Sequence, residues 1–226
     1  MALKILLEGM QTMLAFLGGT GAEGRGLALR FALAGEEVVI GSRDEAKAQA
    51  VAAELQSRAP KAAIHGLKNQ EAAKAGDVVF ITVPYSAQKP LLKEVGHEME
   101  GKVVVDTVVP LAFQGRQARA IPVEEGSAAM QAQQVLPGSL VVAAFHTVSA
   151  VKLLAPEQPV QGDVLVSSDS PEAKKVVMEL AGMIPDLRPV DAGSLENSRY
   201  VEQFTALLLN INRIYKRNLG IRIVGI

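Results

Sequence analysis

Three glycines near the start of the chain have a spacing that can bring a backbone against a phosphate. Gly19, Gly21 and Gly24 follow the pattern G-x-G-x-x-G. The first glycine permits a tight turn, the second lets phosphate oxygens approach where a Cβ would intrude, and the third lets a helix pack closely on its strand. The phosphate then lies among the unpaired N–H groups of the helix N-terminus. This stretch therefore predicts a site for the pyrophosphate of a dinucleotide.

The segments around the glycines distinguish this site from an ordinary glycine-rich turn, which 20 glycines in 226 residues can also produce. The apolar run 12–17 predicts a strand, 25–34 has a helical pattern, and 38–40 predicts a second strand. A dinucleotide-binding fold requires this order of elements. We therefore expect the whole turn to bind the cofactor: Gly19, Thr20, Gly21, Ala22, Glu23 and Gly24.

The end of the second predicted strand indicates which cofactor is bound. The strand ends in Ser42 and Arg43, and it lacks the Asp or Glu with which NAD-specific proteins bind the ribose. Ser42, Arg43 and Lys47 can instead surround a 2′-phosphate, with Thr20 as a further donor. In the alternative interpretation, Ser42 and Glu45 form a capping box for the following helix. Both interpretations can hold together, and the two cations favour NADP over NAD.

Apolar runs alternate with helical patterns up to residue 145, with further strands expected at 63–67, 77–83, 102–106 and 140–145. This alternation predicts an α/β fold, a Rossmann-type doubly wound parallel sheet. Ligands of such sheets bind beyond the carboxyl ends of the strands. We therefore expect one cleft bordered by residues that follow the fourth and sixth strands: Val83, Pro84, His146 and Val148. The alternatives are an ordinary loop after the fourth strand and a structural histidine after the sixth.

The remaining residues mix strands with helices. Strands are expected at 164–167, 187–191 and 220–224, and helices at 171–183 and 194–218. We expect residues 1–145 to form an NADP-binding Rossmann domain, with 1–11 as an N-terminal extension, and residues 146–226 to form a small α+β domain that completes the cleft. The last helix carries more apolar surface than one buried face needs, which favours a homodimer.

Composition argues against several classes of partner. The formal charge is −1 and aromatic residues make up only 4%, so the chain lacks the basic footprint and the stacking platform of a nucleic-acid-binding protein. There is no cysteine, and the three histidines are far apart without ligand spacing, so we expect no metal site. The apolar stretch within 1–11 is too short for a signal peptide or a membrane span. We expect a cytoplasmic protein that does not bind membranes.

Several separate stretches resemble the NADPH-dependent reductases of the deazaflavin coenzyme F420. They are Gly18-Gly19-Thr20-Gly21, Gly26-Leu27-Ala28, Gly41-Ser42-Arg43, Phe145-His146-Thr147 and the segments 187–193 and 195–202. The resemblance covers nearly everything from Met13 onward. It implies an oxidoreductase that transfers a hydride between NADP(H) and coenzyme F420, its substrate.

The resemblance also implies roles for particular residues. It places the 2′-phosphate on Thr20, Ser42, Arg43 and Lys47, and it places His146 and the segment 207–210, which includes Leu208, beside the deazaflavin. A histidine there can hydrogen-bond the ring, and we expect both its neutral and its charged form to be accessible near pH 7. Glu23 is a departure from the pattern, because a carboxylate beside a pyrophosphate repels it unless the side chain turns to solvent.

Two other functions fit part of the sequence. An NADP-dependent imine or 3-hydroxy-acid reductase resembles the first 145 residues, but those families usually append a long all-helical domain, and here the last 76 residues mix strands with helices. A non-catalytic NADP-sensing module requires a nucleotide site without a second ligand pocket, and the apolar last helix argues against it.

Overall fold

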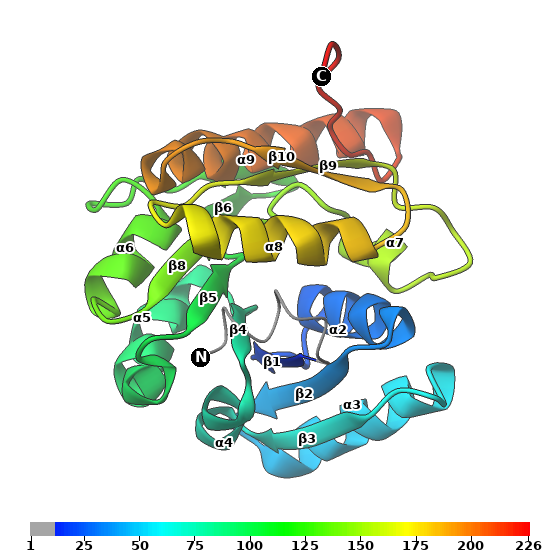
Figure 1. Ribbon diagram of the computed structural model, residues 1–226. Coiled ribbons are helices and arrows are strands. Elements are labelled where there is room, and N and C mark those ends of the chain that lie inside the picture. Colours follow the sequence, from blue (N-terminus) through cyan, green and yellow to red (C-terminus); the bar gives the residue numbers. More distant parts are fainter. Residues whose placement is uncertain (1–11) are drawn as a thin grey trace.

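The computed structural model describes residues 12–226 and is built on a six-stranded sheet (Figure 1). The strands lie in the order β3-β2-β1-β4-β5-β8, and every neighbouring pair is parallel. Their bounds are β1 Met13–Leu17, β2 Glu37–Ser42, β3 Ile64–Lys68, β4 Val78–Ile81, β5 Val103–Asp106 and β8 Leu140–Ala143. The winding reverses between β1 and β4, which makes their carboxyl ends the switch point where such sheets bind ligands. The predicted Rossmann fold is confirmed, and the predicted extension 1–11 lies outside the described residues.

Helices cover both faces of the sheet because its strands are apolar on both sides. Successive residues of β1 alternate between two apolar layers, with Leu14 and Phe16 in one and Ala15 and Leu17 in the other. The helices are α2 Ala22–Ala34, α3 Glu45–Arg58, α4 Asn69–Ala75, α5 Tyr85–Val95, α6 Ala128–Val135, α7 Ala150–Leu153, α8 Pro171–Met183 and α9 Ser198–Tyr215, with 3-10 turns at Gly96–Met99 and Leu195–Asn197. The first layer includes residues of α2, α3 and α8, and the second includes residues of α4, α5 and α6.

The C-terminal part of the chain adds a small parallel pair of strands, β9 Gly162–Val166 and β10 Leu187–Asp191, with α9 lying beside them in Figure 1. An isolated bridge between Ala143 and Ser167 joins this part to the end of β8. One apolar layer contains both Leu14 and Leu187, so a single core runs across the predicted domain boundary at residue 145. The division into two domains stays a prediction.

Three details of the predicted elements were wrong or missing. The expected strand at 220–224 does not form, because Asp163 and Arg188 take up its polar groups: Ile223 N donates to Asp163 and Arg188 donates to Ile223 O. The last helix ends at Tyr215, where Lys216 turns into the left-handed region with φ of 50°. The hairpin of β6 Leu111–Gln114 and β7 Gln117–Ala120 was not predicted. Most of its side chains are exposed, which removes the apolar alternation by which a strand is recognised.

One buried carboxyl group joins α9 to the start of α6. Glu202 of α9 is 3% exposed, and its two oxygens accept hydrogen bonds from the backbone N–H groups of Ala128 and Ala129, at 2.8 and 3.2 Å. These residues open α6, whose N–H groups would otherwise lack partners. Ser198 Oγ of α9 also donates to Ser127 Oγ, 2.7 Å away, and Ser127 caps α6. The position of α9 is therefore tied to α6.

Replacing Glu202 by glutamine should lower the free energy of unfolding by about 1–3 kcal/mol, because glutamine has one acceptor oxygen where Glu202 has two and leaves one buried N–H unpaired. Burial raises the pKa of Glu202 to about 8, so urea unfolding is measured above pH 8, where the group is a carboxylate with two acceptor oxygens. The control is Glu196→Gln, because that side chain is 62% exposed in its pair with Arg199. Equal stability of the two variants would show that Glu202 does not hold α9 in place.

Candidate functional site

An open groove of about 650 Å³ lies at the carboxyl ends of β1, β2 and β4. It is formed by the turn after β1, the end of β2, the segment after β4 and one side of α5. Seven residues of the predicted cofactor site line it: Thr20, Gly21, Ser42, Arg43, Lys47, Val83 and Pro84. The fold thus brings together residues that are more than 60 positions apart in the sequence, at the edge where a doubly wound sheet binds its ligand.

The glycine turn presents the N-terminus of α2 to this groove. Gly21 is the N-cap of α2, and no side chain caps the helix, so its first N–H groups are available to an anion. A Cβ on Gly24 would lie 2.6 Å from Thr82 Oγ1 and 2.7 Å from Gly19 Cα, whereas a Cβ on Gly21 would have no atom nearer than 3.8 Å. The third glycine therefore allows the helix to pack on its strand, and the second faces open space that a ligand can fill.

This contrast separates a structural glycine from a binding glycine. Gly24→Ala should destabilise the fold by about 1–3 kcal/mol, as overpacking does. Gly21→Ala should leave the melting temperature unchanged, because φ at Gly21 is −77° and the space is open, yet it should weaken NADPH binding by at least about tenfold. Thermal unfolding and NADPH titration of both variants measure these effects. If Gly21→Ala binds NADPH like the wild type, the pyrophosphate does not lie against this turn.

The end of β2 has two cations that no carboxylate neutralises. Arg43 and Lys47 are exposed, and within residues 12–226 neither makes an ion pair. The predicted capping box of Ser42 and Glu45 is wrong: Asp44 caps α3 by accepting from Lys47 N at 3.3 Å. Ser42 is 7% exposed, and its Oγ accepts from Asp44 N at 3.2 Å. That hydroxyl therefore lies in the groove with its orientation set by the turn.

Other polar residues line the groove that the sequence did not single out as site residues, among them Asn69 and Asp44. Asn69 begins α4, and its side-chain oxygen accepts from Gly18 N at 3.2 Å, which fixes the start of the glycine turn. Asp44 lies next to Arg43, and its carboxylate is occupied as the helix cap. Asn69 follows directly after β3, so its place at the carboxyl end of a strand was the available signal.

Glu23 is only partly exposed and does not turn fully to solvent. One of its carboxyl oxygens is buried and has no hydrogen-bond partner among the described residues. Burial raises the pKa of Glu23 to about 8, so the carboxyl group is neutral at pH 7. The raised pKa favours the neutral carboxyl group and so lessens the repulsion expected between Glu23 and a pyrophosphate.

His146 follows β8 and lies against α9, outside the groove. Its backbone oxygen accepts from Thr205 Oγ1 of α9 at 3.2 Å, and Leu208 lies one turn further along the same helix. The residue is 7% exposed, and neither ring nitrogen has a partner among the described residues. Burial lowers the pKa of His146 to about 4, so the expectation that its charged form is accessible near pH 7 is wrong.

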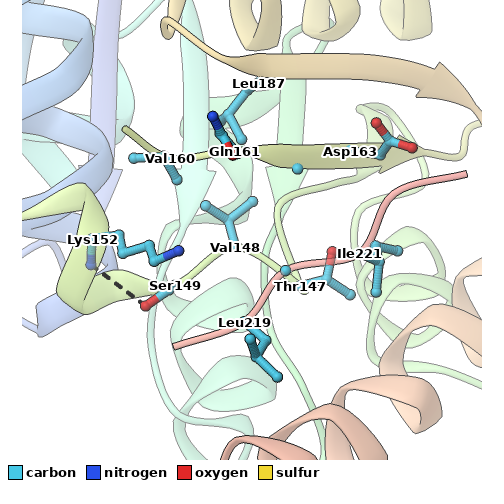
Figure 2. A pocket seen from close by; sticks show the side chains of 12 residues that line it. Thr147, Val148, Ser149, Lys152, Val160, Gln161, Asp163, Leu187, Leu219 and Ile221 are labelled. Carbon is cyan, nitrogen blue, oxygen red and sulfur yellow. Dashed lines mark hydrogen bonds between the residues drawn. The ribbon is translucent and has the colours of Figure 1, made fainter. Parts of the chain in front are cut away.

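Val148 lines a small separate pocket of about 10 Å³, and so it does not reach the groove either (Figure 2). Val148 belongs to the segment after His146, and its side chain points towards Val160 and Gln161, while Leu219 and Ile221 of the C-terminal segment also line the pocket. Asp106, at the end of β5, is fully buried and accepts from Val108 N at 2.9 Å, as a turn-capping residue does. Burial raises the pKa of Asp106 to about 7.

Comparisons with known proteins bear on what binds here. The family model "NADP oxidoreductase coenzyme F420-dependent" matches residues 13–110. The F420-dependent NADP reductase of Methanothermobacter thermautotrophicus is 42% identical over 228 residues, which cover 98% of each chain. That of Methanothermobacter marburgensis is 44% identical over 94% of this chain and 98% of its own. This chain belongs to the F420-dependent NADP reductase family.

Structures of other proteins agree with the family fold. A protein from Arthrobacter sp. FB24, described as an F420-dependent NADP reductase on a provisional basis, superposes with a TM-score of 0.82 at 24% identity over 95% of this chain and all of its own. The imine reductase of Myxococcus stipitatus reaches a TM-score of 0.59 at 16% identity and shares the fold alone. Across residues 12–226, no helix is long and apolar enough to span a membrane, and no cluster of His, Cys, Asp or Glu could hold a metal ion.

Proposed function

We propose that this chain transfers a hydride between NADP(H) and coenzyme F420. The observation that carries the proposal is its 42% identity, over 98% of both chains, to an F420-dependent NADP reductase. The two cofactors supply the hydride donor and acceptor, and the protein binds them, orients them and excludes water.

On the NADP side, the pyrophosphate lies on the N-terminus of α2. Thr20, Ser42, Arg43 and Lys47 surround the 2′-phosphate, and Val83 and Pro84 border the nicotinamide. Three observations support this placement: a helix N-terminus without a side-chain cap, open space at Gly21, and two cations along the same groove that make no ion pair within residues 12–226. The groove also reaches from the start of α3 to α5, across the carboxyl ends of the strands.

On the F420 side, His146 and Leu208 lie beside the deazaflavin. A buried polar group without a partner is rare in folded proteins, so the two free nitrogens of His146 favour a ligand at this place. The imidazole is neutral and has one donor and one acceptor, which suits a hydrogen bond to a ring carbonyl or ring N–H. Residues 146–226 then act as the domain that completes the cleft over residues 1–145.

We also propose a cytoplasmic homodimer that binds neither nucleic acid nor membranes. The absence of cysteine suits a reducing compartment. Large apolar side chains remain exposed on α9 and on the β6–β7 hairpin, with exposed fractions of 53% for Leu207, 65% for Ile214 and 65% for Phe113. Such a patch favours association.

The direct test of the function mixes the purified protein with NADPH and F420 and follows the absorbance of the deazaflavin. We expect reduction that depends on both the protein and NADPH. Reduction of a cyclic imine with no reduction of F420 would favour an imine reductase. NADPH binding without any turnover would favour a sensing module.

NADP preference should depend on Arg43. Each charge-assisted hydrogen bond to the 2′-phosphate contributes about 1.5–3 kcal/mol, partly screened at an exposed site. Arg43→Ala should therefore weaken NADPH binding by roughly tenfold to a hundredfold and leave NADH binding nearly unchanged. Ser42→Asp should reverse the preference by repulsion. The measurement is the ratio of NADPH to NADH dissociation constants. An equal loss of affinity for both cofactors in Arg43→Ala would contradict the assignment.

His146→Ala should raise the KM for F420 by roughly threefold to tenfold, the equivalent of one neutral hydrogen bond, and spare NADPH binding. Because the pKa of His146 is about 4, the size of the effect should be the same at every pH near neutrality. The control is His97→Ala, whose side chain is 63% exposed. Unchanged F420 kinetics in a folded His146→Ala protein would show that His146 does not contact F420 and has at most a structural role.

A further inference from the structure

A buried arginine in α2 holds the segment that follows the proposed F420 residue. Arg30 is 6% exposed, and its guanidinium group donates to five backbone carbonyl oxygens. They belong to Lys152 at 2.6 Å, Leu153 at 2.9 Å, Ala155 at 2.9 Å, Gln158 at 3.0 Å and Pro156 at 3.4 Å. These carbonyls end α7 and form the turn after it, so a single side chain organises the backbone of 152–158. Nη2 contacts three of these oxygens with its two hydrogens, and Nε and Nη1 contact one each. Arginine suits this task because its planar group spreads N–H donors over three nitrogens.

Close packing brings α7 within reach of Arg30. Gly26 lies one turn before Arg30 on the same helix, and a Cβ there would lie 2.6 Å from Leu153 Cβ and 3.4 Å from Ala150 O. The absence of a side chain at this position lets α7 rest directly on α2. The contact between the two helices therefore depends on two independent features, the missing Cβ and the guanidinium group.

The other end of the segment is also held by α2. Phe145 immediately precedes His146, is 1% exposed and has a φ of 68°. A left-handed backbone is unfavourable for a bulky residue and persists only where the surroundings impose it. The ring of Phe145 packs edge-on against Phe31, with centroids 6.2 Å apart and planes at 87°. Phe31 is next to Arg30, so neighbouring residues of one helix hold both ends of 145–158.

We propose that Arg30 is a positioning residue for the reaction. It fixes the segment 145–158, and with it His146, at a set distance from the nucleotide turn at the N-terminus of α2. Because the same rigid helix carries the pyrophosphate site and this clamp, the two cofactors are placed against a common reference. The inference rests on the proposed F420 site beside His146. A merely structural role would affect both cofactors, whereas a positioning role requires that loss of Arg30 impair the kinetics with F420 and leave NADPH binding intact.

The test compares four variants of the full chain. Arg30→Met removes the donors, Arg30→Lys retains a cation with fewer donors, and Gly26→Ala pushes α7 away without touching Arg30. The control is Arg58→Met, because Arg58 donates to a single carbonyl of the same segment, that of Leu154, from an exposed position. Each variant is measured for F420 kinetics with NADPH, for the NADPH dissociation constant by titration, and for hydrogen exchange of the peptides that cover 13–24 and 145–158.

Arg30→Met and Gly26→Ala should lower kcat/KM for F420 by roughly tenfold to a hundredfold, the effect expected when reacting groups are misplaced by about 1 Å. Arg30→Lys should lie between Arg30→Met and the wild type, and Arg58→Met should match the wild type. The NADPH dissociation constant should stay within about threefold of the wild-type value. In free energy, a threefold change is less than half of the roughly 1.4 kcal/mol that corresponds to a tenfold change. Exchange should accelerate in 145–158 and stay unchanged in 13–24.

Several results would overturn the proposal. Unchanged F420 kinetics in folded Arg30→Met and Gly26→Ala would make Arg30 purely structural, and an equal loss of NADPH affinity would mean that α2 as a whole is perturbed. If Arg30→Met does not fold, Arg30→Lys and Gly26→Ala decide by the same criteria. If the wild type does not reduce F420, the proposed function fails, and unchanged exchange in 145–158 would still contradict the clamp.

Discussion

The close contact of α2 with the first strand is the constraint on which the rest of the structure depends. It exists because Gly24 lets the helix approach Gly19 and Thr82 to distances that a Cβ would forbid. This approach leaves the first N–H groups of α2 uncapped at the edge of the groove, where the dipole of the helix favours an anion. The same helix then carries Gly26, Arg30 and Phe31, which hold the segment that contains His146. One glycine contact thus sets the geometry of both proposed cofactor sites.

Burial controls the charge of the ionisable groups near these sites. It raises the pKa of Glu23 to about 8 and that of Asp106 to about 7, and it lowers the pKa of His146 to about 4. Each shift favours the neutral form, because desolvation penalises charge. Burial therefore disfavours the charged forms of these three groups, while the cations at the end of β2 stay exposed. This division suits direct hydride transfer, in which the protein chiefly aligns the two cofactors.

Local patterns in the sequence predicted much of this, and long-range packing explains the rest. The glycine spacing and the strand ends at Ser42 and Val83 predicted the groove, since each depends on residues a few positions apart. The alternative interpretation placed the cap of α3 at Ser42, whereas Asp44 is the cap, and the sequence allowed both because both residue types cap helices. The charge states of Glu23 and His146 depend on burial, which no neighbouring residue reveals. The contacts of Arg30 join residues more than 120 positions apart, and an arginine within an apolar helix gives no sign of its partners.

The most direct test of the account follows the hydride itself. NADPH carrying deuterium at C4 of the nicotinamide, prepared separately in each of its two stereochemical forms, is reacted with F420 in ordinary water, and the reduced deazaflavin is examined by mass spectrometry and NMR. Direct transfer between aligned rings predicts that one of the two forms delivers its deuterium to C5 without dilution by solvent hydrogen. Solvent hydrogen at C5 with both forms would show that an exchangeable protein group intervenes, and would contradict the account.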